Sequence, residues 1–121
     1  MKVTRGAETP AEPLTEGQFS GPVTRQALGS LPSPEAAALV VHFPEGARTG
    51  WHRHRGGQVL YVLEGNGRAS TRNGETVTLA HGDLVYAPPG EEHWHGAVEG
   101  GEMRQLALSF GETEWLGLVE E

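Results

Sequence analysis

Short apolar runs separated by turn-forming residues recur along the chain from Gln18 onward. Within these runs the apolar residues alternate with polar ones or are continuous over about four to eight positions, and none follows the period of an amphipathic helix. The pattern predicts an all-β fold of the sandwich or barrel type. The predicted strands are Ala36–Phe43, Gln58–Leu63, Gly67–Arg72, Glu75–Leu79, Leu84–Ala87, His93–Val98 and Met103–Phe110.

Two dipeptides predict tight turns between these strands. Asn73-Gly74 is expected to close a hairpin, because both residue types tolerate a positive φ angle. Pro89-Gly90 suits the two central positions of a type II turn. Both turns constrain the order of neighbouring strands.

Two of the predicted strands are apolar on both faces. They are Ala38–Val41 and Val59–Leu63, the second of which includes Tyr61. A strand of this kind is covered on both sides, either by a second sheet or by another subunit. This pattern predicts a homodimer.

The first sixteen residues lack this periodicity and contain Pro10 and Pro13. Residues 1–16 are therefore expected to form an arm, and residues 17–121 a single domain, which is the usual arrangement for a chain of 121 residues.

Composition excludes several classes of function. A formal net charge of -7 repels phosphate backbones, so a nucleic-acid partner is not expected. No stretch approaches the length of a membrane span, and we expect a soluble, cytoplasmic protein. Because the chain has no cysteine, any bound metal must be held by nitrogen and oxygen ligands.

Four of the six histidines form two His-x-His pairs, His52 with His54 and His93 with His95. Side chains alternate along a strand, so the members of each pair share a face and lie about 7 Å apart along the backbone. Their imidazoles can converge on one ion, whereas a single pair of this kind is often only structural. Gln58 begins the next strand and offers an amide oxygen, although it can equally be an ordinary hydrogen-bonded residue.

The other two histidines and two tryptophans are not predicted to belong to the site. His42 is out of phase with its apolar neighbours, and His81 lies beside a turn glycine. Trp51 and Trp94 alternate with the histidines, so we expect them to point away from the ion and to pack or line an interface.

The two stretches of sequence that contain the His-x-His pairs resemble the two conserved motifs of the cupin family. Gly46 is followed, after five residues, by His52 and His54, then by Gln58 where cupins usually have Glu, and by Gly65. The second motif is matched by Gly82, Pro88, Gly90 and His93, with Ala97 where Asn is common. The resemblance implies a small cupin-type double-stranded β-helix, a jelly-roll barrel, with His52, His54, Gln58 and His93 as metal ligands.

A narrower resemblance is to the manganese-dependent cupins that act as hydroxynitrile lyases and also use Gln as the fourth ligand. It implies one divalent metal ion per chain, with manganese or iron favoured, while the donor types also accept nickel, zinc or copper. Those proteins have a histidine near the metal, which His95 matches. They have a further active-site histidine where this chain has Gln105.

The ligand set favours Lewis-acid chemistry. Three neutral imidazoles and a neutral amide leave a divalent ion its full charge, which stabilises negative charge on a substrate oxygen. We expect a metal-dependent lyase acting on a small hydroxylated or carbonyl compound, with cyanohydrin cleavage as the most specific form. The alternatives are another cupin enzyme, such as a dioxygenase or isomerase, and a non-catalytic small-molecule-binding cupin.

His95 is the expected catalytic residue. It shares a face with His93 but lies outside the four ligand positions, and an imidazole has an ordinary pKa of about 6.5, close to neutral pH. It is therefore predicted to act as the general base, unless it only orients a ligand or a water molecule.

Overall fold

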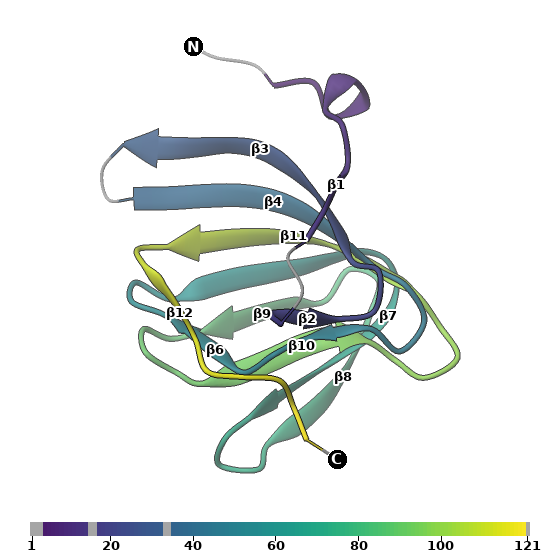
Figure 1. The fold of residues 1–121 in the computed structure, drawn as a ribbon, viewed down its shortest axis with the longest axis vertical. Helices are drawn as coiled ribbons and strands as arrows, with labels where there is room; N and C mark the ends of the chain where they lie inside the picture. Colours follow the sequence, from purple (N-terminus) through teal and green to yellow (C-terminus); the bar gives the residue numbers. More distant parts are fainter. Residues whose placement is uncertain (1–3, 15–16, 33–34, 121) are drawn as a thin grey trace.

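The computed structural model of the protein describes residues 4–14, 17–32 and 35–120. These residues form a short 3-10 helix, η1 (Gly6–Glu8), and a 12-stranded antiparallel sheet that curls into a half-barrel (Figure 1). The strands are β1 (Glu12–Pro13), β2 (Phe19–Ser20), β3 (Thr24–Pro32), β4 (Glu35–Phe43), β5 (Arg48–Thr49), β6 (His52–His54), β7 (Gln58–Thr71), β8 (Thr76–Ala80), β9 (Leu84–Ala87), β10 (His93–Ala97), β11 (Met103–Phe110) and β12 (Thr113–Trp115). The all-β prediction is confirmed.

The sheet folds into two layers that share strand β7. One layer contains β1, β3, β4, β11, β9 and the first half of β7, and the other contains β8, β10, β5, β6, β12, β2 and its second half. Figure 1 shows β3, β4 and β11 lying above β6, β10 and β8. The interior between the layers holds the core, which includes Val41, Phe43, Val62 and Met103.

Strand β7 is continuous where the sequence predicted two strands. It spans Gln58–Thr71 and passes from one layer to the other near Gly65, whose φ is 81°. A Cβ atom at this position would clash with the backbone oxygen of Glu102, so only glycine allows the close approach. The register with β11 shifts between Arg104 and Gln105, next to this bend.

Strand β3 is absent from the sequence prediction. Its sequence contains two residues that weaken strand prediction, Gly29 and Pro32, and few β-branched ones. The strand forms because it pairs with β4 from Thr24↔His42 to Pro32↔Glu35. Tertiary pairing therefore overrides a weak local preference.

Both predicted chain reversals are present, but the first differs in its geometry from the prediction. Gly74 has φ 94° in the turn that joins β7 to β8, whereas Asn73 has no positive φ. The amide of Gly74 donates to the carbonyl of Thr71 at 3.1 Å, which centres this turn on Arg72 and Asn73. Gly90 has φ 80°. The amide of Glu91 donates to the carbonyl of Pro88 at 3.1 Å, as expected for a type II turn centred on Pro89 and Gly90. In the part of the chain that the structure describes, no helix has the length and hydropathy needed to cross a membrane.

Candidate metal centre

The two His-x-His pairs lie on neighbouring strands of one layer. β6 pairs with β10 in the register His52↔His93, and alternation along each strand turns the four imidazoles into the barrel. All four side chains are buried, with 1 to 5% of their surface exposed. Pairing across the layer thus brings together residues that lie some forty positions apart in the chain.

The imidazole rings form a compact cluster. The ring centroid of His52 lies 4.4 Å from that of His93, 5.0 Å from that of His54 and 5.2 Å from that of His95. His54 and His93 are 6.0 Å apart. One nitrogen each of His52, His93 and His95 lie within 4.8 Å of one another, close enough to hold a metal ion. This group of three includes His95, which was predicted as a base, and does not include the predicted ligand His54.

Backbone carbonyls orient two of the rings. Nδ1 of His52 donates to the carbonyl of Gly50, and Nδ1 of His93 donates to that of Glu91, both at 2.9 Å. A carbonyl oxygen only accepts, so in the neutral ring each Nδ1 carries the proton and each Nε2 keeps a lone pair. This arrangement prepares both residues to bind a cation through Nε2.

Gln58 faces this cluster with its amide oxygen. Its Nε2 donates to the hydroxyl of Ser109 at 3.0 Å, which leaves Oε1 2.9 Å from Nε2 of His93. Amide oxygen is a suitable donor for a divalent ion. The side chain is 4% exposed and is therefore part of the interior.

Two ring nitrogens are buried with no hydrogen-bond partner among the described residues, Nε2 of His54 and Nδ1 of His95. The other nitrogen of His54 lies 2.9 Å from the hydroxyl of Thr113. A buried polar atom left unpaired costs about 1–3 kcal/mol. A metal ion offsets this cost, so the residues present fit such a group.

Burial keeps the imidazoles neutral. Loss of solvation, with repulsion from His93, lowers the pKa of His52 to about 3 and that of His54 to about 4. Burial also lowers the pKa of His93. A neutral imidazole is the form that binds metal, so little competition from protons is expected near neutral pH.

The expectation that His95 keeps an ordinary pKa is wrong. Burial lowers the pKa of His95 well below 6.5. Repulsion from the charged forms of His52, His93 and His54 lowers it further. The sequence could not show this, because desolvation depends on how completely the folded chain encloses the ring. His95 remains neutral and able to accept a proton, but it is a weaker base than an exposed imidazole.

The residues excluded by the sequence lie elsewhere. His42 is half-exposed and lies 3.4 Å from the carboxylate of Glu102, and His81 is exposed. Trp94 is 7% exposed, and its ring packs beneath the guanidinium of Arg68, 5.3 Å from the ring centroid. Trp51 packs against Arg72. Neither tryptophan lines the two cavities described below.

The histidine cluster opens onto a cavity of about 270 Å³ in the barrel. Several residues that line it were not predicted from the sequence, including Arg25, Ser109, Thr113 and Trp115. Buried and partly buried residues alternate along β11, and Ser109 lies two positions after the buried Ala107. This alternation could have predicted from the sequence that Ser109 points inward. Trp115 lies 4.8 Å from His52, ring centroid to centroid, but only the pairing of β12 with β6 reveals it.

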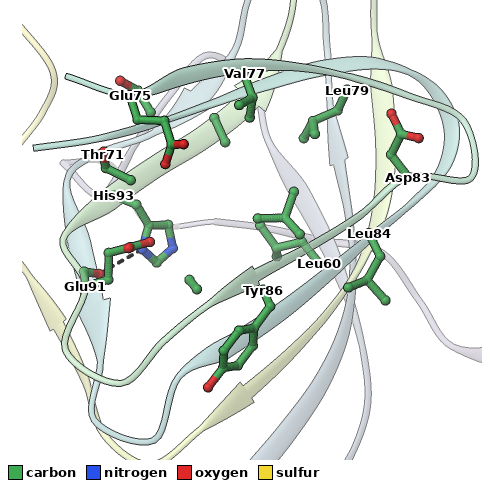
Figure 2. Close-up of a pocket in the computed structure, with 14 residues that line it drawn as sticks. Leu60, Thr71, Glu75, Val77, Leu79, Asp83, Leu84, Tyr86, Glu91 and His93 are labelled. Carbon is green, nitrogen blue, oxygen red and sulfur yellow. Dashed lines mark hydrogen bonds between the residues drawn. The ribbon is translucent and has the colours of Figure 1, made fainter. Parts of the chain in front are cut away.

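A second cavity, of about 430 Å³, is lined by residues of β7, β8, β9 and β10 and of the turns beside them (Figure 2). Its walls include Leu60, Val77 and Tyr86, and among the predicted ligands only His93 lines it. Figure 2 shows the ring of His93 at one end of this cavity, beside Glu91. His93 therefore lines this second cavity, whereas His52, His54 and His95 line the first.

Fold and site together define a jelly-roll barrel with a histidine-rich centre that can hold one metal ion. The cupin domain matches residues 39–109. The chain belongs to the cupin family, as the two motifs indicated.

Known proteins resemble the chain in sequence and in fold. An (R)-mandelonitrile lyase from Granulicella tundricola is 42% identical over 91 residues, which are 74% of this chain and 70% of that protein. A cupin-like protein from Thermotoga maritima has 36% identity and a TM-score of 0.85, with 90% of this chain and 86% of that chain covered. The polyketide cyclase RemF from Streptomyces resistomycificus has a TM-score of 0.81 over 100% of this chain and 87% of its own, but at 22% identity it shows the fold alone.

Proposed function

We propose that the protein is a metal-dependent lyase that cleaves a small cyanohydrin to an aldehyde and hydrogen cyanide. The observation that supports this most is the buried cluster of four imidazoles and one amide oxygen, which has no carboxylate among its predicted ligands. The 42% identity with a mandelonitrile lyase points to the same reaction class.

The predicted ligands are His52, His54, Gln58 and His93, with manganese or iron as the favoured metal. A divalent ion held by neutral donors supplies Lewis acidity, which makes a bound hydroxyl group more acidic and stabilises charge on its oxygen. Ser109 positions the amide of Gln58, and the carbonyls of Gly50 and Glu91 position two of the rings.

His95 is proposed as the general base. Its Nδ1 has no partner among the described residues and the residue lines the barrel cavity, where it can accept the hydroxyl proton of a substrate. As that proton leaves, the carbon–carbon bond breaks and its electron pair departs with cyanide. Because burial disfavours the imidazolium, His95 returns the proton readily to cyanide.

Apolar side chains beside the histidines would limit the access of water to the reaction. Leu39, Phe43 and Ala107 contribute apolar walls beside the histidines. In such a medium the dipoles and charges of the site act more strongly than in water. The volume of about 270 Å³ suits a small substrate.

We also propose a homodimer formed through the outward face of the β4–β11–β7–β9 layer. Cross-strand neighbours on this face are Leu106, Tyr61 and Leu84, since the register pairs Tyr61 with both of the others. Tyr61 and Leu84 are 38% and 61% exposed. The opposite face of this layer, which carries Leu60 and Val62, is covered by the other layer of the sheet. A second subunit is therefore proposed to cover the outward face.

The test of the lyase proposal is a direct assay with racemic mandelonitrile. Metal-loaded protein is expected to release benzaldehyde and cyanide from one enantiomer faster than a metal-stripped sample does. The same assay without oxygen distinguishes the alternatives. Activity that needs oxygen would indicate a dioxygenase, and no turnover by metal-loaded protein would favour a binding protein.

A further inference from the structure

Arg25 lies on β3 and points into the barrel. The register pairs Arg25 with Val41 on β4, and Val41 with Gln105 on β11. Cross-strand partners share a face of the sheet, and both Val41 and Gln105 are buried, at 4% and 0% exposed. Arg25 consequently lines the same cavity as His52 and His95.

The guanidinium of Arg25 has no partner among the described residues. Its Nε is buried without a hydrogen bond, and no ion pair joins it to Glu12, its exposed cross-strand neighbour on β1. By contrast, Arg68 and Arg104 lie 3.5 Å and 2.9 Å from carboxylate oxygens. A buried donor without an acceptor is costly, so its retention inside a cavity points to a ligand.

The cavity favours an anion. Its described lining includes no aspartate or glutamate. Arg25 is thus the one residue of this described lining with a permanent charge. A guanidinium forms paired hydrogen bonds with a carboxylate, and apolar surroundings strengthen them.

We propose that Arg25 provides a carboxylate subsite, so that the cavity binds small hydroxy acids with the carboxylate on Arg25 and the rest of the molecule toward the histidines. The cavity volume of about 270 Å³ limits the ligand to a small molecule. Binding of this kind needs neither metal nor lyase activity, and it stands or falls separately from the proposed reaction.

The test compares mandelate with mandelamide, which has nearly the same shape but no charge. Calorimetry on the full chain, both metal-stripped and metal-loaded, is expected to show mandelate binding at least about tenfold more tightly than mandelamide. Arg25→Gln should remove that preference and leave mandelamide binding unchanged, whereas Arg25→Lys should retain part of it. Arg104→Gln removes the same charge from the outer face of the layer and should have no effect.

Equal affinity of the unmodified protein for the two ligands would overturn the proposal, and this comparison needs no variant. Unaltered mandelate binding by Arg25→Gln would overturn it as well. Thermal unfolding of each variant checks that it folds, and stabilisation by mandelate but not by mandelamide gives an independent reading of the same preference. A preference seen only with metal present would assign the carboxylate to the metal centre and would also contradict the role of Arg25.

Discussion

Oε1 of Gln58 lies 2.9 Å from Nε2 of His93. Because His93 donates its Nδ1 proton to the carbonyl of Glu91, and Gln58 donates through its nitrogen to Ser109, both facing atoms present lone pairs. Two lone pairs this close repel each other unless a cation is shared between them. A proton is disfavoured because burial lowers the pKa of His93, so a metal ion suits the pair best.

The protein should bind about one divalent metal ion per chain, because the buried donors form one cluster. His52→Ala and His93→Ala each remove a ring from its centre and should lower the metal content of the purified protein at least tenfold. Elemental analysis measures this, with His42→Ala as the control because His42 lies outside the cluster. Full occupancy in both variants would contradict the metal site.

Gln58→Glu should change affinity and activity in opposite directions. A carboxylate adds a negative charge, which should tighten the binding of hard ions such as manganese by about tenfold. The same charge makes the ion less electrophilic, so lyase turnover should fall. Titration calorimetry and the mandelonitrile assay measure the two effects, and an unchanged affinity together with an unchanged rate would contradict the argument.

The variant His95→Ala distinguishes between two roles of this residue, general base and metal ligand. If His95 is the base, turnover should fall by roughly 100-fold or more while the metal content stays intact. Loss of the metal would make His95 a ligand, in line with its place among the three nitrogens within 4.8 Å. Unchanged turnover would exclude both roles.

Acid should destabilise the metal-free protein. The folded pKa values of His52 and His54 are about 3 and 4, whereas unfolding restores values near 6.5. Between these limits the unfolded chain binds more protons, so the free energy of unfolding should fall as pH drops from about 6.5 to about 4. Each imidazole contributes up to about 1.4 kcal/mol per pH unit.

Urea unfolding at pH 7 and pH 5 measures this loss. His52→Asn should reduce the dependence on pH, whereas His42→Ala should keep it. A free energy of unfolding that stays constant over this range in the unmodified protein would show that the imidazoles are not shielded from water.

Sedimentation should show a dimer at micromolar concentration. Tyr61→Glu or Leu84→Glu places a charge in the apolar outward face and should produce a monomer with an intact fold. Val77→Glu is a suitable control, because Val77 is also exposed, at 39%, but belongs to β8 in the other layer. A monomeric unmodified protein would remove the dimer proposal.

Much of this molecule could be predicted from its sequence, because strand alternation is a local property. The spacing of His52 and His54 was enough to place both rings on one face, and the turn residues Gly74 and Gly90 were enough to place two chain reversals. The two spaced motifs then identified the cupin fold. Each of these features depends on residues only a few positions apart.

Tertiary structure decided what surrounds the histidines. The contact of Gln58 with Ser109 joins residues 51 positions apart, and that of His54 with Thr113 joins residues 59 apart. β3 forms only because β4 pairs with it, and this pairing turns Arg25 into the cavity. The lowered pKa of His95 has the same origin, because solvent is excluded only when both layers of the sheet close around the ring.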